Sequence, residues 1–248
     1  ALGLLRDQTD STAVGYYAGV YASGSYNTFV GSKAGMGGSN NVAPYDTGTY
    51  NTVVGAGALQ NFSSASYNVA IGYEAMNDTK GASNNVAIGY QAFDVMTTGT
   101  GVAIGYAAGG SVTTGDSNLL VGSSAGAGIT TGARNVIMGI SANRNNNTSN
   151  NTIIGYGAAD GNAGDYNVYI GSQVCGGTSV TGASNVVIGM QAHGISTGPG
   201  AAANNVTIGH QAQFHSSGSS NVAIGYRAGY TNQSSNNVFM GYAAGLYT

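Results

Sequence analysis

The sequence predicts an all-β fold, a parallel β-solenoid of about 14 coils with 16–17 residues in each coil. One short unit recurs along the chain: Asn, Val or Thr, any residue, Ile or Val, Gly, often Tyr, any residue, Ala. The core of the unit places apolar residues two apart, which is the period of a strand. Clusters of Gly, Asn, Ser and Thr separate the units and are typical of turns.

One glycine in each unit, called the anchor glycine below, sets the register of the repeat. Most steps between anchors are 16 or 17 residues. Asn lies four positions before the anchor except at Ser11 and Gly101, and Ala lies three positions after it except at Val174. Columns this uniform indicate a repeated spatial environment, which stacked coils provide. The anchors are Gly15, Gly31, Gly55, Gly72, Gly89, Gly105, Gly122, Gly139, Gly155, Gly171, Gly189, Gly209, Gly225 and Gly241.

Other secondary structures fit the repeat less well. A helix is disfavoured because a glycine recurs in every unit and β-branched residues are frequent. Antiparallel hairpins are disfavoured because no Asn-Gly pair occurs, and that pair is the strongest signal for a two-residue hairpin. The remaining solution is one strand per coil, with equivalent strands stacked in parallel.

The repeat divides the chain into a short start and a long solenoid. Residues 1–10 are predicted to form an N-terminal cap or connector, and residues 11–248 form the solenoid. The step between anchors lengthens to 24 after Gly31 and to 20 after Gly189, so we expect inserted loops near 36–50 and 193–204. Inserted loops of a solenoid lie on its surface and often bind ligands, although loops without a partner are the alternative. The candidate receptor contacts in them are Pro44, Tyr45, Asp46, His193 and Pro199.

Composition excludes several classes of function. Charged residues make up 6% of the chain, and the net charge is −3 with no basic stripe, so nucleic acid is not an expected partner. Disorder is disfavoured because aliphatic residues follow a strict period. Nothing approaches 18 consecutive apolar residues, so no membrane insertion is expected. The single cysteine, Cys175, excludes an intrachain disulfide and is expected to be buried.

The residue in the middle of each predicted strand, two positions before the anchor, predicts an oligomer. This column carries no charge, and the flanking residues on the other face of the strand are also apolar. A strand that is apolar on both faces is usually covered on both faces, and we expect other copies of the chain to cover this one. The alternative is that the many alanines of the column tolerate exposure. The candidate inter-chain packing residues are Phe29, Leu120, Ile137, Ile153, Tyr169 and Phe239.

Two polar columns have a structural and a functional interpretation. Stacked asparagines can form a hydrogen-bonded ladder from coil to coil, or alternatively a row of sugar-binding amides. The tyrosine column after the anchor, such as Tyr73, Tyr90 and Tyr106, is expected to form a stacked stripe, with glycan binding as the alternative. The structural asparagine column comprises Asn27, Asn51, Asn68, Asn85, Asn118, Asn135, Asn151, Asn167, Asn185, Asn205, Asn221 and Asn237.

No catalytic residue, metal ligand or cofactor site is expected. Glu74, Asp78 and Asp94 on adjacent coils are the nearest approach to a pair of carboxylates for acid and base catalysis. Glu74 occupies a column otherwise filled by solvated residues such as Gln91 and Arg227. The three histidines match no metal-binding spacing. The chain is therefore not expected to be an enzyme.

The repeat resembles two known groups over roughly residues 11–245. The unit Asn85-Val86-Ala87-Ile88-Gly89-Tyr90-Gln91-Ala92 is similar to the head repeats of YadA-type trimeric autotransporter adhesins and to repeats in bacteriophage tail fibres. The resemblance implies a left-handed β-roll, three chains side by side, and attachment to a surface. The adhesin repeat is shorter and is followed by a neck, a stalk and a membrane anchor, which do not occur in this sequence. A self-cleaving chaperone domain of tail fibres does not occur either.

These observations predict a structural and adhesive protein: a trimeric phage tail fibre, or a segment of one, that attaches to a host-surface glycan or protein. The expected partners are copies of itself, the host receptor, and in some arrangements end-to-end copies or other tail proteins. The expected location is the virion tail or the cell exterior. Two alternatives remain open, a bacterial cell-surface adhesin head and a self-assembling extracellular filament.

Overall fold

The computed structural model describes residues 9–38, 46–161, 164–177, 182–194 and 202–247. The expectations for the first eight residues and for Pro44, Tyr45 and Pro199 fall outside these ranges. In the described part of the chain, every regular element is a short β-strand. The strands are β1 (Thr12–Val14), β2 (Thr28–Val30), β3 (Thr52–Val54), β4 (Val69–Ile71), β5 (Asn85–Ile88), β6 (Gly101–Ile104), β7 (Asn118–Val121), β8 (Val136–Met138), β9 (Thr152–Ile154), β10 (Val168–Ile170), β11 (Val186–Ile188), β12 (Val206–Ile208), β13 (Val222–Ile224) and β14 (Val238–Met240).

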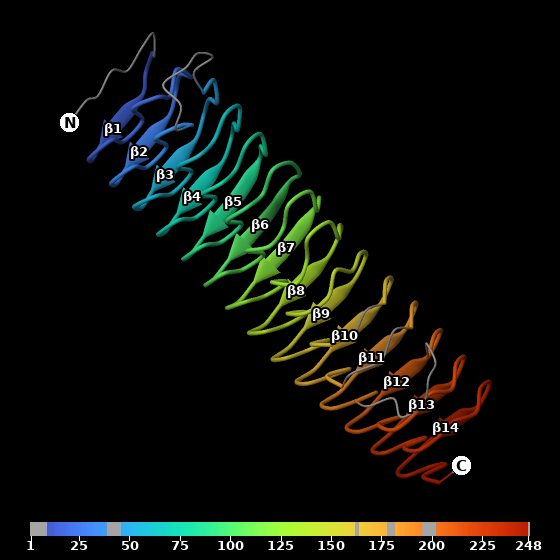
Figure 1. The fold of residues 1–248 in the computed structure, drawn as a ribbon. Helices are drawn as coiled ribbons and strands as arrows, with labels where there is room; N and C mark the ends of the chain where they lie inside the picture. The colour runs from blue at the N-terminus through green and yellow to red at the C-terminus, as the bar shows by residue number, and fades with distance from the viewer. Residues whose placement is uncertain (1–8, 39–45, 162–163, 178–181, 195–201, 248) are drawn as a thin grey trace. The chain divides into compact units, whose positions relative to one another are not determined.

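The chain forms two compact units, residues 1–124 and 125–248. In the first unit, strands β1 to β7 pair in parallel with their neighbours in chain order. Strands β8 to β14 do the same in the second unit. Each coil contributes one strand, and the coils of each unit stack on one another (Figure 1). The predicted all-β parallel solenoid is therefore confirmed for each unit.

The pairing register follows the repeat in the sequence. Val69 pairs with Val86 and Ile71 with Ile88, so equivalent residues of successive units lie side by side. The β-branched residues of each unit favour a strand. The strand ends at the anchor glycine, whose φ is +135° at Gly89. A Cβ on Gly89 would lie 2.4 Å from the carbonyl oxygen of Gly105 in the next coil, so only glycine allows this close approach.

The chain turns after each strand through a recurring series of left-handed residues. In the coil that follows β4, Glu74 and Met76 both have φ of +53°. Such conformations cost about 1–2 kcal/mol for a residue with a side chain. Stacking offsets this cost because the backbone N–H of Met76 donates to the carbonyl of Ala92 in the next coil at 3.0 Å. The turn is therefore held by neighbouring coils and not by local preference.

The core of each unit lies inside the coils. The middle residue of the strand is buried there, together with the alanine three positions after the anchor and the residue that follows it. In the coil after β5 these last two are Ala92 and Phe93, both fully buried. The side chains that fill the interior therefore come from both the strand and the turn.

This arrangement corrects the assignment of the inter-chain packing residues. Phe29, Leu120, Ile137, Ile153 and Tyr169 are 0–1% exposed in the single chain and cannot reach another copy. Phe239 in β14 is half-buried, and a Cβ on Gly229 would lie 2.9 Å from its ring, so it too points inward. The prediction of their role was wrong because the interior of the coil, and not a partner chain, covers this face of the strand.

Candidate functional site

The opposite face of each strand is largely aliphatic and partly exposed, with threonine at Thr12, Thr28, Thr52 and Thr152. It is formed by the residues three and one positions before the anchor glycine, and we call it the outer strand face. In the first unit its most exposed aliphatic members are Val14, Val30, Val54, Ile71 and Ile104, at 36–57%. The columns that form this face contain no charged residue. The absence of charge and the exposed aliphatic side chains are both typical of a surface that another protein covers.

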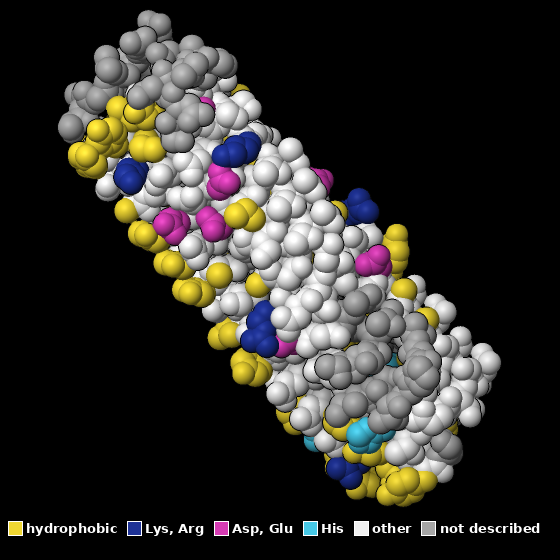
Figure 2. All heavy atoms as spheres, in the orientation of Figure 1, with side chains coloured by type: hydrophobic (Ala, Val, Ile, Leu, Met, Phe, Trp, Pro, Cys, Tyr) yellow, Lys and Arg dark blue, Asp and Glu magenta, His cyan; other side chains and the backbone are white. Residues whose placement is uncertain are grey.

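The second unit presents the same face. Its most exposed aliphatic members are Met138, Ile154, Ile208, Val238 and Met240, at 36–68%. On the side of the molecule that Figure 2 shows, Lys, Arg, Asp and Glu are scattered among uncharged side chains. Sequence reasoning recognised that both faces of the strand are apolar but took the face that is buried inside the coil for the exposed one.

Tyrosines stack beside the outer strand face. The rings of Tyr73 and Tyr90 are 5.4 Å apart with an angle of 12° between their planes, and those of Tyr90 and Tyr106 are 4.9 Å apart at 6°. A second stack joins Tyr50 to Tyr26 and to Tyr67. Because the ring faces contact one another, a ligand would meet mainly ring edges and hydroxyl groups. This arrangement disfavours sugar stacking on the middle rings.

The asparagine column forms a ladder in the interior. The backbone N–H of Asn51 donates to Oδ1 of Asn27 at 2.8 Å, and the Nδ2 group of Asn51 donates to the carbonyl of Ala65 at 2.8 Å. Asn68 repeats the pattern on Asn51 and Ala82. Up to β13 the side chains of this column are at most 2% exposed, so these amides cannot form a sugar-binding row. They stabilise the contact between coils.

The two described candidates for receptor contact are buried. Asp46 is 7% exposed, and its carboxylate accepts a hydrogen bond from the backbone N–H of Gly38. Burial raises the pKa of Asp46 above its usual value. His193 is 1% exposed, and burial lowers its pKa to about 4. Neither side chain is presented to a receptor, which corrects both assignments.

The three carboxylates considered for catalysis lie within one acidic neighbourhood. Glu74 accepts a hydrogen bond from the Gln91 amide at 2.8 Å, and Asp78 pairs with Lys80. The pKa of Asp94 is raised, mainly by burial and then by the charges of Glu74 and Asp78. Across the described ranges, no group of three His, Cys, Asp or Glu is placed to hold a metal ion.

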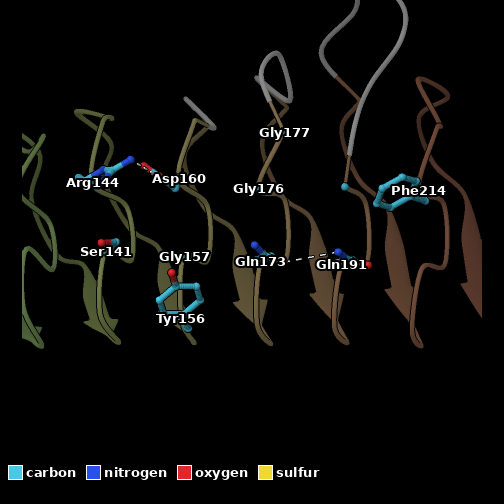
Figure 3. A pocket seen from close by; sticks show the side chains of 11 residues that line it. Ser141, Arg144, Tyr156, Gly157, Asp160, Gln173, Gly176, Gly177, Gln191 and Phe214 are labelled. Atoms are coloured by element: carbon cyan, nitrogen blue, oxygen red, sulfur yellow. Dashed lines mark hydrogen bonds and ion pairs between the residues drawn. The ribbon is translucent and has the colours of Figure 1, made fainter.

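A surface groove crosses the coils of β8 to β12 in the second unit. Its volume is about 320 Å³, and its lining follows two columns of the turn, two and five positions after the anchor. Arg144 and Asp160 stand at one end and Phe214 at the other (Figure 3). Gly176 and Gly194 line the groove between these ends, in the same column. The groove exists because these two coils carry no side chain where their neighbours carry large ones.

Polar groups line both columns of this groove. Arg144 and Asp160 form an ion pair at 3.0 Å, and the Gln191 amide donates to Gln173 at 3.4 Å. Tyr156, 60% exposed, lies on the side of the glutamines (Figure 3). Sequence reasoning missed the groove. The signal for it was the run Arg144, Asp160, Gly176, Gly194, Phe214 in one column, where two glycines interrupt large side chains.

Comparisons of the chain with protein-family models, with curated proteins and with solved structures give no match. Among the residues that the structure describes, no helix has the length and apolar character needed to cross a bilayer.

Proposed function

We propose that this chain is a structural and adhesive fibre protein, a segment of a trimeric phage tail fibre that attaches to a glycan or protein on a host-cell surface. The observation that carries the proposal is the outer strand face, which is aliphatic, uncharged and exposed in both units. The resemblance of the repeat to tail fibres and trimeric adhesins supports an assembly of three copies and attachment to a surface.

The outer strand face supports self-association for two physical reasons. Full burial of one Val, Ile or Met side chain contributes about 1.5–3 kcal/mol, and this face repeats such side chains in successive coils. Identical copies also carry these side chains at the same strand spacing of about 4.8 Å. The rows of side chains on two copies can therefore pack against each other in register. A second and a third copy are therefore the partners that fit this face.

The proposal assigns the chain no catalytic step. In the acidic neighbourhood, Lys80 pairs with Asp78, and the neutral Gln91 amide donates to Glu74. The repeated interior serves to stack coils. Stacked repeats of this kind serve as scaffolds that present binding surfaces.

Charge placed on the outer strand face tests the association. We expect the double variant Ile71→Lys and Ile104→Lys to dissociate into single chains while its circular dichroism spectrum stays unchanged, because buried lysines would lack partners. The matched control is Ala107→Lys with Ser124→Lys, in the column that already holds Lys33 and Arg227. The control should keep the mass of the unmodified protein. Equal masses for both variants would contradict the proposed face.

Attachment is tested by incubating the fluorescently labelled protein with bacterial cells and with their isolated surface polysaccharides. Saturable binding to cells is expected. Long polymers without cell binding would favour the filament alternative, and surface display on the producing bacterium would favour the adhesin alternative.

A further inference from the structure

The groove of the second unit has the shape of an elongated binding site. It crosses β8 to β12, which are paired in chain order. Four strand spacings of about 4.8 Å give it a length of roughly 19 Å along the stack. Its lining belongs to the turn after the anchor and not to the outer strand face, so association of copies through that face leaves the groove available.

The lining offers both donors and acceptors of hydrogen bonds. Gln191 in the lining donates to Gln173 at 3.4 Å, and Gln211 of the next coil, which is not part of the lining, donates to Gln191 at 3.1 Å. Each amide carries two N–H donors and an acceptor oxygen. Ser141 lines the groove in the column of the glutamines, and Arg144 lines it in the other column (Figure 3). A ligand that is rich in hydroxyl groups matches such alternating donors and acceptors.

An aromatic ring closes one end. One face of Phe214 stacks on Tyr230, with ring centroids 5.6 Å apart and 16° between the planes. On another side the ring lies over Gly194, because a Cβ there would be 2.3 Å from Phe214 Cε2. Since Gly194 has no side chain, the ring borders the hollow directly. An apolar ring beside amides suits a ligand with both C–H faces and hydroxyl groups.

The charges of the lining cancel. Arg144 and Asp160 are the charged members among its 11 residues, and they pair with each other at 3.0 Å. Asn145 also donates to Asp160 at 2.7 Å, so this carboxylate is already satisfied. A paired lining attracts neither anions nor cations strongly. The ligand class that fits is therefore uncharged.

We infer that this groove binds a neutral oligosaccharide that lies along the coils, with its hydroxyl groups on the glutamine amides and one sugar face on Phe214. This inference rests on the proposed function and narrows its surface ligand to an uncharged glycan. No bond is made or broken in this binding.

Filling the groove tests the inference. Gly157 lines the groove at φ +56°, and a Cβ there would have nothing closer than Gln173 Cγ at 3.8 Å. Glutamine already occupies this column at Gln173, Gln191 and Gln211 with similar φ, so Gly157→Gln is expected to fold normally. Binding of neutral malto-, cello-, xylo-, manno- and chito-oligosaccharides is measured by calorimetry, with sialylated and uronic-acid oligosaccharides for comparison. The unmodified protein should bind at least one neutral member, and Gly157→Gln should weaken that binding at least tenfold.

The matched control is Ala107→Gln, which has the same column position and a φ of +50° in the first unit. Its affinity should equal that of the unmodified protein. Unchanged affinity in Gly157→Gln, preference for the anionic sugars, or no binding across the neutral panel would each overturn the inference. If cells still bind the protein in those cases, the proposed function survives and only the groove fails. If neither cells nor oligosaccharides bind, both fail.

Discussion

Single residues decide how closely the coils approach. Most anchor glycines, such as Gly15 and Gly89, bring the backbones of adjacent coils so near that any side chain would collide with a carbonyl group. Most of the asparagines four positions before an anchor bind the next coil through both the side-chain oxygen and the amide, as Asn51 and Asn68 do. These two columns were evident in the sequence because the same contact recurs in each coil.

An alanine at an anchor should separate two coils. In Gly89→Ala the new Cβ would lie 2.4 Å from the Gly105 carbonyl oxygen, on a backbone with φ of +135°. We expect a loss of at least about 2 kcal/mol in the free energy of unfolding, measured by urea denaturation. Gly81→Ala is the control, because its Cβ would meet the Ser64 side-chain oxygen at 3.3 Å and the Thr97 carbonyl oxygen only at 3.8 Å. Equal stability of the two variants would contradict the role of the anchor.

His193 should make the second unit sensitive to acid. Its side chain is buried, and its pKa falls from 6.5 to about 4 on folding. The unfolded chain then binds more protons between these values, so the free energy of unfolding decreases as the pH falls from 6.5 to 4. A shift of this size corresponds to roughly 3 kcal/mol.

The variant His193→Met isolates this effect, since Met76 fills the same column in another coil. Urea denaturation at pH 7, 5 and 4 should show a smaller loss of stability in the variant than in the unmodified protein. Parallel pH dependence in the two proteins would show that His193 is not the responsible group.

At the scale of the element, the sequence was sufficient to predict the parallel strands but not the direction in which they face. The period of the strand distinguishes two faces and says nothing about which one the turn covers. Ala87 and Phe29 point inward because the left-handed turn folds back beneath them. The groove was not predicted for a similar reason. It depends on the absence of side chains at Gly176 and Gly194, whereas the repeat was recognised from residues that recur in each unit.

Because coils are equivalent, one coil should be removable. Deletion of residues 90–105 joins Gly89 to Tyr106 and keeps every column in register. We expect a cooperatively folded protein with a modestly lower Tm, since stability in such stacks is nearly a sum over neighbours. Deletion of residues 90–97 shifts the register by half a coil and should give a much larger loss. A similar Tm for both deletions by circular dichroism would contradict the equivalence of the coils.

At the scale of the whole molecule, the proposed trimeric fibre requires association of copies through the outer strand face. The most direct test is the mass of the purified chain in solution, measured by light scattering coupled to size-exclusion chromatography. The chain has a mass of 24.6 kDa, and the account predicts a discrete species of three chains that persists on dilution. A monodisperse species with the mass of one chain would contradict the account, because the exposed aliphatic face would then have no partner of its own kind.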